Sequence, residues 1–355
     1  MGICSFTQKI IPPDINMKKS ICYHSIVCCI FYLLVGCSDD AANRNDLTQT
    51  DPLPSWNEGK TKSAIIDFVD RATDPEHQDF IAIEDRIATF DNDGNLWSEQ
   101  PMYFQLLFTI DRVKAMAGQH PEWKEEQPFK AVLEDDIPTL LSLEHKDLFK
   151  LLMATHAGIT TTAFNQEVKK WMKFSKHPRF NQPYTELVYQ PMLELMQFLR
   201  SKDFQVFIVS GGGVDFMRAW VTDVYGIPSY QVVGSSMASK FEESQGRVVI
   251  NKVAKIDFID DKEGKPVGIH KFIGKRPVFA SGNSDGDLQM MQYTAAGEGS
   301  RFMLYLHHTD GKREWAYDRN SSIGKLDKGL DEAKKHNWTV IDMAKDWRVI
   351  YPFEQ

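Results

Sequence analysis

The sequence predicts an α/β fold built around an open β-sheet, and two patterns indicate it. Short apolar segments at 87–90, 204–209 and 277–281 each run into a cluster of Asp, Asn, Ser or Gly, as buried strands that end in turns do. Segments with apolar residues at helical spacing precede two of them, at 60–73 and 191–200. Open α/β sheets bind ligands at the carboxyl ends of their strands, so we expect the polar clusters to form one site.

The chain of 355 residues has the composition of a soluble globular protein, with 42% hydrophobic and 25% charged residues. This length accommodates one large domain or two smaller ones. The formal net charge is −8, and no basic run offsets it. Because nucleic acids are bound by clustered Lys and Arg, we expect no nucleic-acid partner.

Residues 1–37 have the pattern of a targeting segment, which we exclude from the fold. A positive start at Met17-Lys18-Lys19 precedes the apolar stretch 21–35, which is too short to favour a permanent membrane span. The stretch runs into Leu34-Val35-Gly36-Cys37, which resembles a bacterial lipoprotein box. The resemblance implies a signal peptide and a lipid anchor at Cys37, in the bacterial cell envelope on the outer membrane or the periplasmic face. An ordinary signal peptide or an uncleaved anchor is the alternative.

Two further features of the sequence follow from this segment. All cysteines lie at or before the box, so we expect no disulfide framework, thiolate metal site or cysteine nucleophile in the folded part. Residues 38–58 are rich in Asp, Asn, Thr, Ser and Pro, a composition that cannot bury a core. We therefore predict a flexible linker between the targeting segment and the fold.

The first polar cluster contains the closely spaced carboxylates Asp91 and Asp93, directly after the strand at 87–90. Two carboxylates this close repel each other unless a positive group lies between them, which predicts a divalent cation. Gly94 allows the backbone to turn sharply beside that ion. A turn with two solvated acids is the alternative, and partner residues at other strand ends decide between the two.

The second polar cluster is Ser210-Gly211-Gly212-Gly213, between the strand at 204–209 and a helix at 214–225. A hydroxyl and exposed backbone amides at a strand end can bind the oxygens of a phosphate group. The alternative is a glycine-rich tight turn.

The remaining segments complete the predicted organisation. Residues 98–185 are helical in pattern, residues 230–259 are typical of a β-hairpin, and 301–306 is one more strand. We expect His307 and His308 in a loop or at the rim of the site, and the aromatic-rich tail from Trp315 to pack on the core.

Three segments resemble motifs of the haloacid dehalogenase superfamily, in the order of that family. Asp91-Asn92-Asp93-Gly94 resembles its first motif, Ser210 at a strand end its second, and Gly282-Asn283-Ser284-Asp285-Gly286-Asp287 its fourth. The chain is most similar to the phosphoserine-phosphatase-like branch. The resemblance implies a Rossmann-like doubly wound parallel sheet formed by residues 59–97 and 186–355, with 98–185 as an inserted helical cap.

The resemblance also implies roles for individual residues. Asp91 would be the nucleophile and Asp93 the general acid/base. Ser210, Gly211, Gly212 and Lys265 would bind the phosphate, with Ser210 and Lys265 also catalytic, although Lys271 is a rival for the lysine. Mg²⁺ would be held by Asp91, Asp93, Asn283 and Asp287. Asn283 stands where the family usually has an acid, and Asp285 is an extra carboxylate that could take either role.

The implied activity is hydrolysis of a small phosphate monoester through an aspartyl-phosphate intermediate, with Mg²⁺ as cofactor. A phosphotransferase or phosphomutase of the same fold is the first alternative, and a non-catalytic phospholigand-binding lipoprotein is the second. Phosphoserine phosphatases place a Glu shortly after the first motif, and Glu99 is near that position. Trp171, Tyr184 and the first cap helix are candidate specificity contacts, and the sequence leaves the oligomeric state open.

Overall fold

The computed structural model describes residues 51–244 and 246–354. The chain divides into two units, residues 1–49 and 50–355, and only the second is considered below. The predicted targeting segment and lipid anchor at Cys37 lie outside the described residues and stay predictions, as does the cell-envelope location. Among the described residues, no helix has the length and apolar character that a membrane crossing needs.

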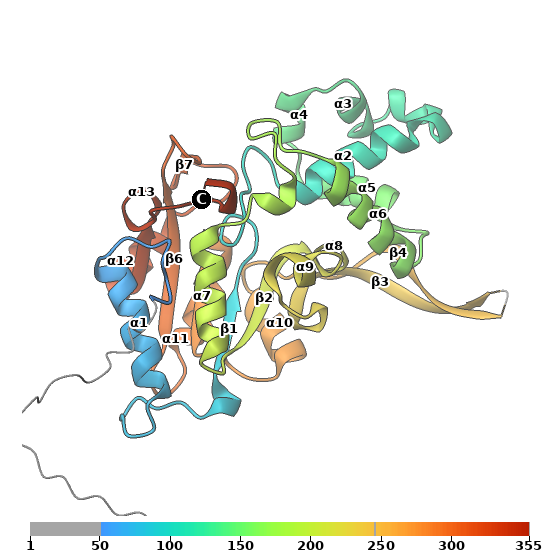
Figure 1. Cartoon of the computed structure of the whole chain (residues 1–355). Coiled ribbons are helices and arrows are strands. Elements are labelled where there is room, and N and C mark those ends of the chain that lie inside the picture. The colour runs from blue at the N-terminus through green and yellow to red at the C-terminus, as the bar shows by residue number, and fades with distance from the viewer. Residues whose placement is uncertain (1–50, 245, 355) are drawn as a thin grey trace, which may run out of the picture. The chain divides into compact units, whose positions relative to one another are not determined.

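The core is a mostly parallel sheet of eight strands (Figure 1). Its strands are β1 (Ile87–Phe90), β2 (Gln205–Gly213), β3 (Val232–Ser244), β4 (Arg247–Phe258), β5 (Phe279–Gly282), β6 (Phe302–Thr309), β7 (Ala316–Tyr317) and β8 (Thr339–Asp342). The order is β4-β3-β2-β1-β5-β6-β7, and β8 also pairs with β6. The chain builds β1, β2 and β3 outward and then returns to β5 on the other side of β1. This reversal is the topological switch point, where open α/β sheets bind ligands, and it confirms the predicted fold class.

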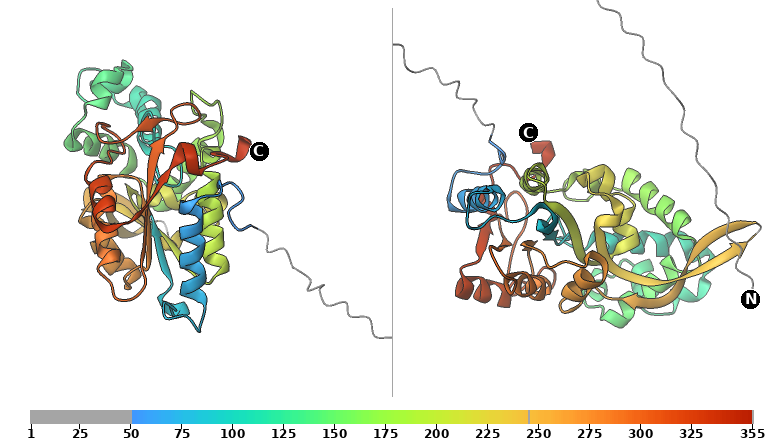
Figure 2. Two further views of the ribbon diagram at one scale, coloured as in Figure 1. Left: turned by 90° about the vertical axis from the view of Figure 1, so that its left-hand side faces the viewer. Right: turned by 90° about the horizontal axis from the view of Figure 1, so that it is seen from below.

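Helices cover both faces of the sheet, as Figure 2 shows. On one face lie α1 (Lys60–Thr73), α7 (Gln190–Ser201), α8 (Val214–Arg218) and α9 (Val221–Tyr225), whose apolar side chains join one core cluster with Phe90 and Phe279. On the other face, a second cluster contains side chains of α11 (Leu288–Ala295) and α12 (Lys328–His336). The single helix predicted at 214–225 is therefore two short helices, interrupted at Ala219 and Trp220.

A helical cap lies between β1 and β2 in the sequence and has a small core of its own. It contains α2 (Phe104–Met116), α3 (Phe129–Leu133), α4 (Ile137–Leu141), α5 (His145–His156) and α6 (Thr161–Phe174). Met102, Ile110, Trp123, Phe129 and Leu151 are among the side chains buried in this separate cluster. The predicted helical insert at 98–185 contains these five helices.

The predicted hairpin is present as β3 and β4, which pair in antiparallel fashion and project from the sheet beside the cap (Figure 1). The cap contacts β4 through its backbone. The N–H of Gly158 donates to the carbonyl of Lys252 at 2.9 Å, and the N–H of Lys252 donates to the carbonyl of Ile159 at 3.0 Å. The hairpin therefore forms a side wall between cap and core.

The C-terminal part differs from the sequence prediction in two places. His307 and His308 lie inside β6 rather than in a loop, and His308 is buried. Residues 339–342, expected only to pack on the core, form β8 and pair in parallel with β6. The sequence predicted the first part of β6 at 301–306 but not its extension to Thr309. It did not reveal β8, because that strand is only four residues long and pairs with a strand distant in sequence.

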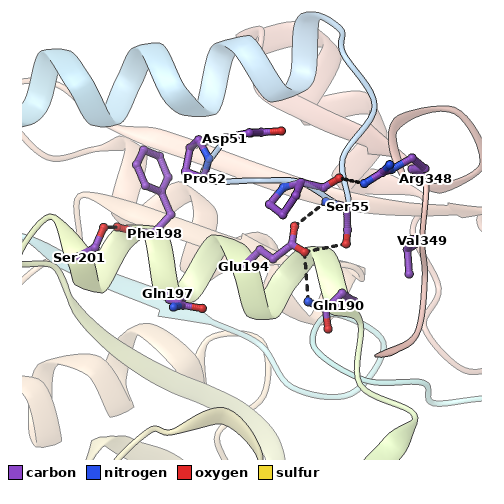
Figure 3. Close-up of a pocket in the computed structure, with 11 residues that line it drawn as sticks. Asp51, Pro52, Ser55, Gln190, Glu194, Gln197, Phe198, Ser201, Arg348 and Val349 are labelled. Carbon is purple, nitrogen blue, oxygen red and sulfur yellow. Dashed lines mark hydrogen bonds between the residues drawn. The ribbon is translucent and has the colours of Figure 1, made fainter. Parts of the chain in front are cut away.

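The predicted linker 38–58 is wrong over its last residues. Leu53 and Trp56 are buried in the main core, where Trp56 packs edge-on against Trp347 and donates from Nε1 to the carbonyl of Pro191 at 3.0 Å. Figure 3 shows the neighbouring cavity of about 850 Å³, where the buried carboxylate of Glu194 accepts hydrogen bonds from the N–H and hydroxyl of Ser55 at 2.8 and 2.6 Å. One aliphatic side chain, Leu53, and one aromatic side chain, Trp56, therefore anchor this segment to the core despite its polar composition.

Trp56→Ala should lower the free energy of unfolding by about 3–5 kcal/mol, because it removes a large buried side chain and leaves a cavity against Trp347. Urea unfolding followed by tryptophan fluorescence and circular dichroism measures the change. Ile83→Ala is the control, since Ile83 is 55% exposed and its loss should change stability by no more than about 0.5 kcal/mol. Equal stability of the Trp56 variant and the wild type would contradict the anchored segment.

Candidate active site

The first predicted motif lies at the carboxyl end of β1, in the centre of the sheet. The N–H of Asp91 donates to the carbonyl of Ser281 at 2.9 Å, which continues the pairing of β1 with β5 beyond the strand. Gly94 has φ +73°, and a Cβ there would lie 2.2 Å from Nδ2 of Asn283. The turn after Asp93 therefore requires glycine both for its backbone conformation and for the approach of the β5 loop.

Hydrogen bonds from neighbouring side chains hold the carboxylate of Asp93 and the backbone of the turn. The indole of Trp97 donates to Oδ1 of Asp93 at 2.7 Å. Asn95 donates to the backbone carbonyl of Asp91 at 3.1 Å and accepts from the hydroxyl of Ser281 at 2.9 Å. The amide side chain thus fixes the turn on β5.

Lys265 joins the first and last motifs. It lies in α10 (Gly264–Gly268) and is 2% exposed. Its ammonium donates to Oδ1 of Asp91 and to Oδ1 of Asp287, both at 2.6 Å, and to the carbonyl of Val209 on β2 at 2.9 Å. The rival Lys271 is exposed on the next turn and lies over the ring of Phe258. The geometry therefore favours Lys265 as the lysine of the site.

Burial and like charge perturb the acids of this cluster. Burial raises the pKa of Asp91, the carboxylate of Asp287 adds to the rise, and Lys265 opposes it. Burial likewise raises the pKa of Asp93 to about 6, against the hydrogen bond from Trp97. Burial disfavours the charged form of Lys265, but Asp287 and Asp91 outweigh it and raise its pKa. One ammonium among several buried carboxylates leaves negative charge that a further cation would neutralise.

The second predicted motif lies beside the first because β2 pairs with β1. Ser210 is buried, and its hydroxyl accepts the N–H of Gly212 at 3.1 Å. A Cβ on Gly212 would lie 3.4 Å from Oδ2 of Asp93, so this glycine faces the acid directly. From the cap, Gln105 on α2 accepts the N–H of Gly213 at 2.7 Å. Cap and loop are thereby joined above the carboxylates.

The fourth motif supplies three candidate oxygen ligands, and the structure distinguishes among them. Asp285 accepts the N–H groups of Asp327 and Gly329, which places its carboxylate at the start of α12 rather than at the site. Asp287 accepts from Lys265, Ser284 and the N–H of Asn283, so both of its oxygens are engaged. Asn283 donates from Nδ2 to Glu99 at 2.8 Å, which orients its amide.

The donor set fits a hard divalent cation. Oδ1 of Asn283 is buried and has no hydrogen-bond partner among the described residues. An amide oxygen, the carboxylate of Asp91 and the backbone carbonyl of Asp93 are the oxygen donors that Mg²⁺ accepts in proteins. No group of three His, Cys, Asp or Glu side chains in the described ranges is arranged as a metal site.

Two acids of the site, Asp260 and Asp261, were not predicted from the sequence, and His308, expected in a loop or at the rim of the site, instead supports the first motif from within a strand. Asp260 is fully buried next to this cluster, and burial raises its pKa to about 8. Asp261 follows Asp260 in the chain and lines the cavity above the carboxylates that is described next. Nε2 of the buried His308 lies 2.7 Å from the carbonyl of Gly94 and supports the turn of the first motif. The position of Asp260 and Asp261 directly after the predicted hairpin could have indicated them as site residues, because the acids of the first motif also follow a strand directly.

Most of the predicted residues line one cavity of about 330 Å³ under the cap, whereas Asn283 is buried beside it and is not part of the lining. Its floor is formed by Asp91, Asp93, Ser210, Gly211, Gly212, Lys265 and Asp287. Tyr103, Gln105 and Leu106 of the first cap helix and the segment before it also line it. Trp171 and Tyr184 do not. They stack on each other with ring centroids 4.6 Å apart in the main core, so their proposed contact with substrate is wrong. Glu99 lines the cavity and accepts from Tyr317 at 2.8 Å.

Lys265→Met should destabilise the protein by about 3–5 kcal/mol near neutral pH, because it leaves buried carboxylates without their cation. Because burial favours the neutral carboxyl of Asp91, the variant binds this proton more tightly when folded than when unfolded. Its unfolding free energy should therefore fall relative to wild type as pH rises above about 4, the unfolded carboxyl pKa. Urea unfolding in EDTA at about pH 5 and about pH 8 measures this.

The matched control for this experiment is Lys271→Met, which removes an exposed lysine from the turn that follows α10. We expect its stability to stay within about 1 kcal/mol of wild type at both pH values. A larger effect of Lys271 than of Lys265, or a pH dependence of the opposite sign, would contradict the assignment.

The family of the chain follows from its comparison with known proteins. No curated protein matches the chain. A structure of unknown function from Anaerococcus prevotii is 15% identical, covers 82% of this chain and 94% of its own, and has a TM-score of 0.48. A phosphoserine phosphohydrolase-like protein from Francisella tularensis is 16% identical over 71% of this chain and 99% of its own, with a TM-score of 0.37. Residues 88–292 match the family model described as haloacid dehalogenase-like hydrolase. That match covers more than half of the chain and confirms the predicted enzyme class: the chain belongs to the haloacid dehalogenase-like hydrolase family.

Proposed function

We propose that the protein is a Mg²⁺-dependent phosphomonoester hydrolase that acts through an aspartyl-phosphate at Asp91. The observation that carries the proposal is the convergence of Asp91, Asp93, Ser210 and Lys265 on one cavity beneath the cap. Dehalogenation needs neither a second acid beside the nucleophile nor a cation. The retained Asp93 and the cation-ready oxygen of Asn283 therefore favour a phosphate ester as substrate.

Asp91, the carbonyl of Asp93 and Asn283 would hold Mg²⁺. The bound ion would supply Lewis-acid charge that reduces repulsion between a carboxylate nucleophile and a phosphate dianion. The remaining chemistry belongs to side chains of the chain itself.

In the first step, a carboxylate oxygen of Asp91 attacks phosphorus and the bond to the ester oxygen breaks. Asp93, whose pKa burial raises to about 6, holds a proton that the leaving alcohol takes up. The Ser210 hydroxyl and the Gly211 and Gly212 amides lie where the phosphoryl oxygens would be bound. Lys265 has its three protons engaged by Asp91, Asp287 and Val209. It therefore acts by orienting Asp91 and supplying positive charge, and a phosphate would have to displace one of these acceptors to bind it directly.

In the second step, Asp93 accepts a proton from the water that attacks the aspartyl-phosphate, and inorganic phosphate leaves. Bulk water is limited by the cap, where Gln105 is bonded to Gly213 across the opening. Since the first step needs Asp93 protonated and the second needs it ionised, a pKa near neutrality suits both.

Asp91→Asn should lower hydrolysis of p-nitrophenyl phosphate on the order of a thousandfold or more, because the amide cannot form the acyl phosphate. The assay uses the chain from residue 51, which retains Leu53 and Trp56, with Mg²⁺ and separately with EDTA. Asp67→Asn on the exposed face of α1 is the control and should keep wild-type turnover. Metal-independent turnover, or turnover that survives Asp91→Asn, would contradict the proposal.

Asp93→Asn should affect alkyl phosphates more than p-nitrophenyl phosphate, because nitrophenolate leaves without needing a proton. With p-nitrophenyl phosphate we expect a burst of one product per enzyme followed by slow turnover, since the second step still lacks its base. Stopped-flow absorbance measures the burst. Unchanged turnover in this variant would contradict the acid/base role of Asp93. A wild-type protein that binds phosphate esters without hydrolysing them, with an affinity that Asp93→Asn leaves unchanged, would favour the phospholigand-binding alternative. Phosphate transfer to an added alcohol in wild type would favour the phosphotransferase alternative.

A further inference from the structure

The catalytic cavity has two chemically different parts. Its floor is the charged cluster described above. Its upper walls come from the cap helices α2, α5 and α6 and from the β3–β4 hairpin with the residues after it. These elements contribute mostly apolar side chains to the cavity, among them Leu106, Leu152, Phe164, Met237, Ile256 and Phe258. Most of these side chains are only half-buried, whereas Phe164 is fully buried.

The charged groups outside the floor offer little to an ionic substrate. Among the described residues that line the cavity, the lysines are Lys252 and Lys265, and both are ion-paired. Lys252 is 4% exposed, pairs with Asp215 and lies over the ring of Phe164 at 4.9 Å. Its charge is thus already compensated.

The remaining ionisable groups add no positive charge. Burial lowers the pKa of His156 well below its ordinary value, so the imidazole is neutral. Glu99 and Asp261 are acids. A carboxylate on the leaving group would meet these acids and no free cation, at a cost that burial increases.

Building on the proposed function, we infer that the substrates are phosphate monoesters of apolar alcohols, alkyl or aryl, without a second anionic group. The phosphate lies on the charged floor and the alcohol packs between cap and hairpin. Removing apolar surface from water favours such a leaving group in proportion to its area. A cavity of about 330 Å³ is near the lower end of the range for small-molecule sites, so the alcohol has to be compact.

The test is a series of straight-chain alkyl phosphates with the intact enzyme and Mg²⁺. Methyl, butyl and hexyl phosphate present similar chemistry at phosphorus and differ in apolar length. We expect kcat/KM to rise with length, by up to about fourfold per methylene that is fully buried. Phenyl phosphate should also be a good substrate. O-phosphoserine and glycerol phosphate should be at least about tenfold worse than hexyl phosphate, as expected when polar groups enter an apolar pocket.

Two variants place the effect in the upper walls. Leu152→Asn on α5 and Ile256→Asn on β4 should each reduce the ratio of kcat/KM for hexyl over methyl phosphate by about tenfold, because each adds a polar group where the chain packs. Ile83→Asn, a polar change at an exposed site outside the cavity, is the matched control and should leave the ratio unchanged. Circular dichroism and urea unfolding verify that each variant is folded. If one of the two wall variants misfolds, the ratio measured for the other tests the inference.

The outcomes separate this inference from the proposed function. If kcat/KM rises with the length of the alkyl group and this rise is lost in the wall variants, the result supports both the proposed function and the apolar substrate class. Hydrolysis of O-phosphoserine or glycerol phosphate as fast as hexyl phosphate, or a flat chain-length series, overturns the apolar substrate class and leaves the phosphatase proposal standing. No metal-dependent hydrolysis of any ester in the panel overturns the proposed function and the inference with it.

Discussion

The site depends on one buried ammonium. Lys265 is surrounded by Asp91, Asp287 and the carbonyl of Val209, so a single charge holds together the loops that follow β1 and β5 and the end of β2. In a low-dielectric interior, such a group is stable only with its partners in place, and the partners repel one another without it. The same arrangement orients Asp91, the proposed nucleophile. Stability and chemistry therefore rest on the same contacts, and the residual negative charge explains why the site suits a divalent cation.

The sheet topology makes these contacts possible. The central strands β2, β1 and β5 are parallel neighbours, so three polar clusters far apart in sequence reach one edge of the sheet. The turn of the first motif is held by a hydrogen bond between His308 on β6 and the carbonyl of Gly94, and by the hydrogen bond between Ser281 and Asn95. This second layer of hydrogen bonds limits the movement of Asp91 and Asp93, which preorganises the acids for a reaction in which charge moves between oxygens.

Cap and hairpin determine what can reach that edge. Gln105 joins the cap to Gly213 at the end of β2, and the backbone of Lys252 joins the hairpin to the cap. The ion pair between Lys252 and Asp215 adds a link from the hairpin to α8 of the core. These links combine hydrophobic packing with a few directional bonds. They account for a cavity that is charged where phosphorus would react and apolar where the leaving group would lie.

The sequence by itself determined the strand ends, the family and most residues of the site. Acids, glycines and hydroxyls directly after apolar strands form short contiguous motifs, which can be recognised without knowing their partners. Asp91, Asp93, Ser210 and Lys265 were all predicted, and the structure brings them together. Only the tertiary structure decided between Lys265 and Lys271, showed that Asp285 caps α12, and buried Leu53 and Trp56 in a segment of polar composition. It also placed β8 and His308 in the sheet and moved Trp171 and Tyr184 into the core. These features depend on the direction of a side chain or on a partner far away in the chain, and spacing along the sequence encodes neither.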